Sequence, residues 1–216
     1  MVDLVDGFAG TSGVDIVGRT EDPGWTTAGE NYDVRISTSN GVYGTSTPAG
    51  SGRGGAKFDT GSADMFAELR LKTVSATLVG PAVRVIDKNN WVGVYLGGVG
   101  AGGLRMYKKV AGTQTILTTE QPVDESVYRL EGVYTDATNS TYELFEDGVG
   151  MLDGAKTILN SEISGTNQFS GIMNDGDNTA STINNWDDFS GGALGAGAVT
   201  GIRNPFGGPL SMRSPI

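Results

Sequence analysis

Hydrophobic and polar residues alternate with a period of two along most of this chain, which is the pattern of a β-strand with one face on a core. In residues 65–72 every odd position is apolar, and Glu68, Arg70 and Lys72 occupy even positions. A helix would also give this segment an apolar face, so its alternation alone leaves both structures open. Ten further segments are short, rich in Val, Tyr, Thr and Phe, and bounded by turn residues. They predict strands over residues 32–37, 41–45, 81–87, 91–96, 104–110, 113–119, 127–134, 141–146, 169–174 and 183–189.

Turn signals and chain length set the fold class. Asn40-Gly41 and Asp147-Gly148 lie between predicted strands, where type I′ hairpin turns accept a positive φ. No convincing amphipathic helix lies between the strands, so the pattern predicts an all-β antiparallel sandwich or barrel. A chain of 216 residues is expected to form one domain, with room for an appendage.

The last part of the chain differs from the rest. Residues 191–216 contain seven Gly and three Pro, and their few large apolar residues show no period. Such a segment buries too little surface by itself to offset its ordering entropy. We therefore expect a domain over residues 1–190 and an extended arm over residues 191–216, which becomes ordered on another subunit. The arm residues expected to make assembly contacts are Arg203, Phe206, Leu210 and Arg213.

Composition excludes several kinds of chemistry. The chain has no Cys and no His, which removes disulfides, thiolate and imidazole metal sites, and Ser-His-Asp triads. Its net charge of −10 argues against a nucleic-acid partner and against an anionic membrane surface. No signal segment and no long apolar run is visible, so we expect a soluble protein made in a cytoplasm.

Carboxylate pairs are the remaining route to catalysis. Glycoside hydrolysis requires two carboxyl groups about 5–9.5 Å apart, which residues i and i+2 of one strand satisfy. The only such acidic pair is Asp175 and Asp177, in a segment typical of a turn. These two residues offer oxygen ligands that suit calcium, although most such clusters are simple turns. The sequence leaves open a pair assembled from two strands, and we predict no enzymatic activity and no cofactor apart from this calcium alternative.

One predicted strand carries an aromatic pair. Trp91 and Tyr95 share a face, whereas the aliphatic residues between and beyond them occupy the other face. If the aliphatic face is inward, the two rings form an outward platform beside Asn89 and Asn90 that suits the stacking of a sugar ring. The alternative is a strand covered on both faces or at an interface, which is favoured because large aromatic residues are mostly buried.

The order of the segments along residues 3–190 resembles a known family. The segments that carry the resemblance are Asp6-Gly-Phe8, Gly24-Trp25, and residues 63–71, 79–95, 104–109, 128–134, 142–148 and 183–189. They resemble a concanavalin A-like (laminin G-like) jelly roll of the kind found in tailed-bacteriophage virion proteins. The resemblance implies two stacked antiparallel sheets, with the first and last strands side by side and Phe8 near Phe189. The Glu-x-Asp-x-Glu strand of the glucanase members is absent, which argues against inherited hydrolysis.

The resemblance also implies a function. We expect a non-enzymatic virion structural protein, a capsid decoration or minor tail component, that is made in the host cytoplasm and located in the virion. Its partners would be other virion proteins and further copies of itself, contacted through the arm, and a host-surface glycan. The alternatives are a free carbohydrate-binding lectin module and, less favoured, a glycoside hydrolase or lyase.

Overall fold

The structure is a computed structural model of the whole chain. It describes residues 4–8, 16–17, 24–28, 32–36, 42–46, 54–72, 79–96, 103–120, 122, 125–151, 153–174 and 186–195. The predicted turn at Asn40-Gly41 lies outside these residues.

Every regular element in the described part of the chain is a β-strand, as the period-two pattern predicts. The strands are β1 (Leu4–Asp6), β2 (Thr26–Thr27), β3 (Tyr32–Ile36), β4 (Val42–Ser46), β5 (Gly54–Asp59), β6 (Met65–Leu71), β7 (Val79–Asp87), β8 (Asn90–Leu96), β9 (Leu104–Val110), β10 (Thr113–Glu120), β11 (Val127–Tyr134), β12 (Asn139–Glu146), β13 (Val149–Gly150), β14 (Lys156–Leu159), β15 (Phe169–Asn174) and β16 (Trp186–Ala193). No helix long and apolar enough to cross a membrane occurs among these residues.

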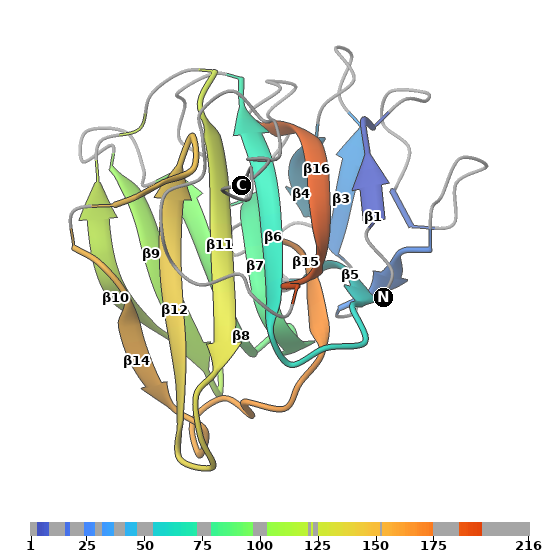
Figure 1. Cartoon of the computed structure of the whole chain (residues 1–216). Helices are drawn as coiled ribbons and strands as arrows, with labels where there is room; N and C mark the ends of the chain where they lie inside the picture. The colour runs from blue at the N-terminus through green and yellow to red at the C-terminus, as the bar shows by residue number, and fades with distance from the viewer. Residues whose placement is uncertain are drawn as a thin grey trace, which may run out of the picture.

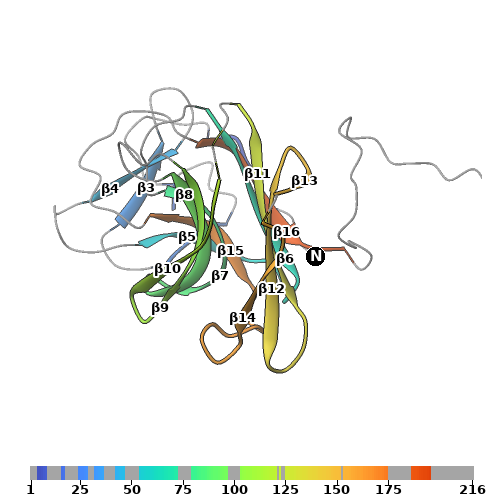
Figure 2. The same ribbon diagram turned by 90° about the vertical axis from the view of Figure 1, so that its left-hand side faces the viewer.

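The strands form two antiparallel sheets that stack as a jelly-roll sandwich (Figure 1). One sheet has nine strands, in the order β13-β12-β11-β6-β16-β4-β3, with β1 on β16 and β14 on β12. The other has seven, in the order β10-β9-β8-β7-β15-β5-β2. Figure 2 shows the layers from the side, with β7, β8 and β9 in one and β6, β11 and β12 in the other. The predicted fold class is confirmed.

Alternation along the central strands places the core between the sheets. In β6 every second residue from Met65 to Leu71 is buried, and β12 alternates in the same way from Asn139 to Phe145. β11 alternates from Val127 to Leu130, and Glu131 and Gly132 after it are buried as well. The ambiguous segment at residues 65–72 is therefore a strand, because its apolar odd positions meet the other sheet. Each inward side chain adds apolar burial that stabilises the stack by about 1.5–3 kcal/mol.

The first and last strands lie side by side, as the resemblance implies. β1 pairs antiparallel with β16, and Asp6 lies opposite Phe189. The aromatic residues nearby pack edge to face, with Trp25 and Phe189 centroids 4.8 Å apart and Trp25 and Phe58 centroids 5.7 Å apart. Phe8 is fully buried in the same apolar cluster.

The last strand of the sandwich extends past residue 190, where we predict the domain to end. β16 continues to Ala193, where Gly191, Gly192 and Ala193 pair with β6. The amide of Leu194 then donates to the carbonyl oxygen of Asp64 at 2.8 Å, and its side chain is buried. Packing accounts for a glycine in this strand, because an added Cβ at Gly191 would come within 2.8 Å of the Phe189 ring.

Candidate functional site

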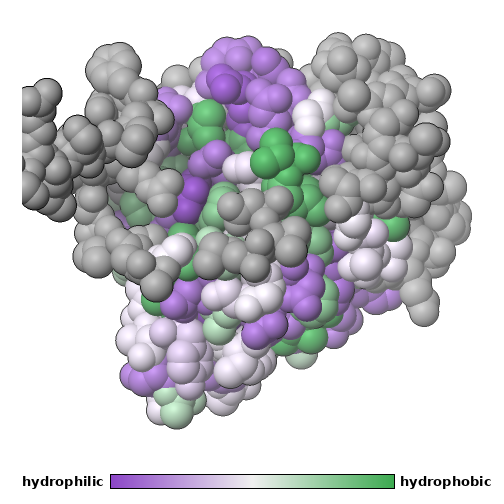
Figure 3. Space-filling view, turned by 45° about the vertical axis from the view of Figure 1, so that its right-hand side comes forward, coloured by the Kyte–Doolittle hydropathy of each residue, from purple (hydrophilic) through white to green (hydrophobic). Residues whose placement is uncertain are grey.

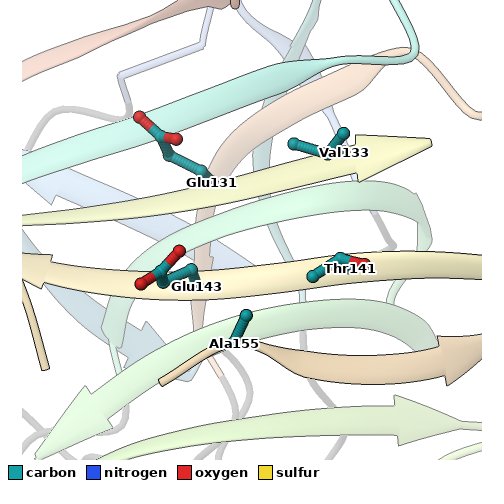
Figure 4. Close-up of a pocket in the computed structure, with 5 residues that line it drawn as sticks. All are labelled: Glu131, Val133, Thr141, Glu143 and Ala155. Carbon is teal, nitrogen blue, oxygen red and sulfur yellow. The ribbon is translucent and has the colours of Figure 1, made fainter. Parts of the chain in front are cut away.

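A pocket of about 370 Å³ opens on the outer face of the nine-stranded sheet, over β11 and β12. Its lining consists of two cross-strand pairs and one residue from the segment before β14. Glu131 lies opposite Glu143, and Val133 lies opposite Thr141. Ala155 completes the wall on the side of β14. Figure 4 shows Glu131 and Glu143 at one end of the pocket, with the Glu131 carboxylate turned away from Glu143, Val133 and Thr141 at the other end, and Ala155 between them.

Strand alternation explains why these side chains share a face. On β11, Tyr128 and Leu130 are buried in the sandwich core, so Glu131 and Val133 point the other way. On β12, Tyr142 and Leu144 occupy the core, which turns Thr141 and the facing acid outward. The antiparallel register then fixes which outward residues meet.

Glu131 is held by a basic partner. Its Oε1 accepts a hydrogen bond from Arg129 Nε at 2.6 Å, and both side chains are largely buried. The guanidinium also lies 3.6 Å from the centroid of the Phe66 ring and 3.9 Å from Glu68 Oε2. A charge-assisted bond of this kind, partly screened from water, keeps the Glu131 carboxylate fixed in one position.

Glu143 has no basic partner among the described residues. Burial raises the pKa of its carboxyl group, and the charge of Glu131 raises it further. Space for this carboxylate comes from Gly150, where an added Cβ would lie 2.8 Å from Glu143 Oε1. The pocket thus combines one fixed carboxylate with one that keeps its hydrogen-bonding capacity for a ligand.

This arrangement has a definite chemical capacity. Two ionised carboxylates offer only acceptors, and the Thr141 hydroxyl donates and accepts. Val133 and Ala155 supply apolar contact beside them. A ligand with neighbouring hydroxyl donors and a C–H face would match these groups, whereas an anionic ligand would meet two like charges.

The predicted aromatic platform is on the predicted face but is not exposed. Val92, Val94 and Leu96 belong to the core between the sheets, and Trp91 and Tyr95 belong to a second apolar cluster on the opposite face. Trp91 is 0% and Tyr95 is 4% exposed. The structure therefore corresponds to the alternative in which this strand is covered on both faces.

Close packing accounts for the burial of Trp91. Its ring lies over Gly93, where an added Cβ would come within 2.4 Å of the indole. The ring centroid of Tyr107 lies 4.9 Å from that of Trp91, and Lys109 Nζ lies 5.8 Å from the latter. The indole Nε1 donates to the carbonyl oxygen of Lys88 at 3.2 Å. A ligand cannot stack on this ring in the arrangement described.

Asn89 and Asn90 are used by the turn between β7 and β8. Asp87 Oδ1 accepts from the Asn89 amide at 2.7 Å and from Asn90 Nδ2 at 3.0 Å. Asn90 Oδ1 in turn accepts from the Ala111 amide at 2.9 Å. Their predicted glycan contacts stay a prediction, and the hydrogen bonds observed here are those of a turn.

The other predicted site residues lie outside the described part of the chain. They are Asp175 and Asp177 for calcium, and Arg203, Phe206, Leu210 and Arg213 for assembly contacts. Within the described residues, no three acidic side chains come together in a way that would hold a metal ion.

The Glu131–Glu143 pair is the feature that sequence reasoning missed. Both strands were predicted, but their register was not. The signal lies in the connection around Asp136, whose Oδ1 accepts the amides of Thr138 and Asn139 at 2.7 and 2.8 Å. A hairpin centred on residue 137 places residue 131 opposite residue 143.

Comparison with known proteins adds fold-level similarity only. No protein-family model matches the sequence. No match was found among curated proteins.

Solved structures with related sheet arrangements include carbohydrate-binding domains. Carbohydrate binding module CBM66 from Bacillus subtilis has a TM-score of 0.44 at 15% identity, with 79% of this chain matched to 92% of that chain. The exoplasmic/lumenal domain of VIP36 in its Ca2+/Man-bound form has a TM-score of 0.46 at 12% identity, with 89% of each chain matched.

A third comparison is with a longer protein. The GH43 BlXynB protein from Bacillus licheniformis has a TM-score of 0.45 at 14% identity over 64% of this chain. This chain spans only 29% of the length of a mutant of that GH43 protein and 28% of the length of a xylan beta-1,4-xylosidase from Bacillus halodurans.

Proposed function

We propose that this protein is a non-enzymatic carbohydrate-binding module whose ligand occupies the pocket over β11 and β12. The observation that carries the proposal is the Glu131–Glu143 pair, in which one carboxylate is held by Arg129 and the other is available. Side-by-side carboxylates accept hydrogen bonds from neighbouring hydroxyl groups of a sugar ring. Val133 and Ala155 lie where the C–H face of that ring would make apolar contact.

Charge supports a neutral sugar as the ligand class. The pocket contributes two carboxylates to a chain of net charge −10, and the Arg129 guanidinium is already paired with Glu131. A sialic or uronic acid would bring a further negative charge to this surface at an electrostatic cost. A neutral hexose or pentose unit brings only hydroxyl donors, which these acceptors require.

The arrangement of the two carboxylates supports the binding of a glycan rather than its hydrolysis. Glycoside hydrolysis uses carboxyl groups that flank the scissile bond, one to protonate the leaving oxygen and one to attack or to activate water. Glu131 and Glu143 extend from the same sheet face, and the Glu131 carboxylate is bound to Arg129 and turned away from Glu143 (Figure 4). They are therefore placed to hold one edge of a ring rather than to enclose a bond.

One observation favours hydrolysis as the second candidate function. The raised pKa of Glu143 beside a fixed, ionised Glu131 is the asymmetry that an acid and its partner need. The hydrolase candidate predicts reducing-end release from a polysaccharide that is lost in Glu143→Gln. The binding proposal predicts no release with either protein.

Glycan-array binding followed by calorimetry tests the proposal. The full chain should bind a neutral glycan, and Glu143→Gln should weaken the affinity about 10-fold, since a hydrogen bond to a charged acceptor contributes about 1.5–3 kcal/mol. Glu125→Gln is the matched control, because Glu125 is an exposed glutamate whose partner is Lys72. Equal affinity of the two variants, or absence of binding to any neutral glycan, would contradict the proposal.

We also propose that the module belongs to a bacteriophage particle. The support is the resemblance of residues 3–190 to virion jelly rolls, together with a C-terminal composition that suits an assembly arm. In this setting the module would be a capsid decoration or minor tail component that contacts host-surface glycan. Mass spectrometry of purified particles tests the location: the chain should be present at a fixed ratio to the major capsid protein, and its absence would contradict the virion role.

A further inference from the structure

Arg84 is the largest charged side chain among the fully buried residues that the structure describes. It lies in β7 where the pairing with β8 is irregular. Between the pairs Val83–Val92 and Asp87–Asn90, β7 has three residues and β8 has one. Arg84 has a φ of +55°, a left-handed value that non-glycine residues rarely adopt. Strain of this kind is retained where the surrounding structure requires it.

The guanidinium of Arg84 is only partly satisfied. Nη1 donates to the carbonyl oxygen of Asn167 at 2.8 Å. Nε and Nη2 are buried and have no hydrogen-bond partner. Among the described residues, no carboxylate lies within ion-pair distance of the Arg84 guanidinium. Asp64 interacts with its charge over a longer distance, and Asp64 Oδ1 already accepts a hydrogen bond from the Tyr134 amide at 2.8 Å. A buried charge without a paired counter-charge is costly.

Two buried hydroxyl groups near Arg84 also lack a well-formed hydrogen bond. Tyr142 projects from β12 of the opposite sheet, and its fully buried hydroxyl interacts with the Arg84 guanidinium and with Ser140 without forming a hydrogen bond of good geometry. Ser170 lies opposite Val83 in the register of β15 and β7, one residue from Arg84. Its buried Oγ is also without a partner.

Arg84 Nε and Nη2 need acceptors, and the Asn167 carbonyl is already used by Nη1. The two hydroxyls both donate and accept, so a water molecule would complete their hydrogen bonds but would leave the guanidinium charge unbalanced, whereas a small anion accepts from all of these donors. An anion would also balance the buried guanidinium charge. We propose that Arg84, Tyr142 and Ser170 bind a small monovalent anion of the halide class, chloride under ordinary conditions, between the two sheets.

Thermal unfolding of the full chain tests this proposal. The melting temperature is measured at constant pH and ionic strength while sodium gluconate is replaced by sodium chloride or sodium bromide. A ligand that binds only the folded state raises the melting temperature in a saturable way. The expected result is a saturable increase with chloride and with bromide that gives a dissociation constant for each.

Variants assign the effect to the cluster. Arg84→Met should abolish the halide dependence, whereas Arg70→Met should retain it, because Arg70 is an exposed arginine paired with Asp188. If Arg84→Met does not fold, Tyr142→Phe and Ser170→Ala each remove one donor and should weaken the halide affinity about 3- to 10-fold. A crystal grown in bromide should show anomalous density beside Arg84. Identical melting curves in all three salts, or halide dependence unchanged in the donor variants, would overturn the proposal.

Discussion

Glu131 and Glu143 lie opposite each other in the register of β11 and β12, and of the two only Glu131 has a basic partner in the described part of the chain. The Arg129 guanidinium offsets the charge of Glu131. The Glu143 carboxylate has no such partner, and its pKa is raised by burial and by repulsion from Glu131. Like charges directly opposite on one sheet face destabilise the pairing of strands. The protein therefore keeps an unfavourable pair at the place where a pocket opens, which is typical of a binding site.

The pair makes stability depend on pH in a defined direction. The pKa of Glu143 in the folded state lies above its ordinary value of 4.5, so the folded protein binds more protons than the unfolded chain between the two values. The stability that Glu143 contributes is fully present below its ordinary pKa of 4.5, and it is lost as the pH rises through its raised pKa in the folded state. Glu143→Gln removes the titrating group, so its melting temperature relative to wild type should increase from pH 4 to pH 7. A difference that is constant over this range would show that the repulsion is absent.

Gly150 is predicted to be necessary for the geometry of the site. Gly150→Ala places a methyl carbon 2.8 Å from Glu143 Oε1, and the carboxylate, as the end of a flexible side chain, must move away. We expect glycan affinity to fall about 3- to 10-fold, the effect of one hydrogen bond, with little change in melting temperature. Gly154→Ala is not a suitable control because of the positive φ at residue 154. Gly195→Ala serves instead, since nothing lies within 4 Å of an added Cβ there.

Most of the strands could be predicted, because each buries one face and so alternates. The predicted segments 104–110, 127–134 and 169–174 coincide with β9, β11 and β15. β5 was not predicted, since Gly54 and Gly55 give it no side chains that alternate; Gly55 is required because an added Cβ would lie 2.1 Å from the Ile172 carbonyl oxygen. Close approach between backbones is a property of the assembled sheet and leaves no periodic signal in the chain.

Trp91 is predicted to contribute to stability and not directly to ligand binding. Removing a fully buried Trp leaves a cavity and typically costs about 3–5 kcal/mol. Trp91→Ala should therefore lower the urea midpoint strongly, while Trp91→Phe retains part of the packing against Tyr107. If folded Trp91→Phe bound glycan with much reduced affinity, the aromatic face would have to open in solution, and the site would lie there.

The candidate site shows which structural relationships could not be predicted from the sequence. The face of each residue follows from alternation, and Trp91 and Tyr95 do share the face that the pattern predicts. Whether that face is exposed depends on what packs over it, and whether Glu131 meets Glu143 depends on the register of a hairpin. Both are tertiary relationships, and neither has a signature within a single strand.

Asp6 is predicted to anchor the first strand. Its buried side chain accepts two hydrogen bonds, from the Phe8 amide at Oδ1 and from Trp25 Nε1 at Oδ2, each at 2.8 Å. Asp6→Asn replaces one acceptor with a donor that faces another donor. The expected loss in the free energy of unfolding is about 1–3 kcal/mol. In a double-mutant cycle, Trp25→Phe removes the indole donor that faces residue 6 and should recover part of this loss. Additive losses would show that the hydrogen bond from Trp25 Nε1 is not involved.

Two truncations separate the folded body from the proposed assembly arm. A chain that ends at residue 195 retains β16, including the bond from the Leu194 amide to Asp64, and should unfold at the wild-type temperature. A chain that ends at residue 190 loses the pairing of Gly191, Gly192 and Ala193 with β6, together with the buried Leu194 side chain. We expect this shorter chain to lose about 2–5 kcal/mol, the usual cost of removing a large buried apolar side chain. If the arm has the proposed role, the chain ending at residue 195 should remain folded and yet be absent from purified particles. Normal incorporation of that chain would assign particle assembly to the sandwich itself.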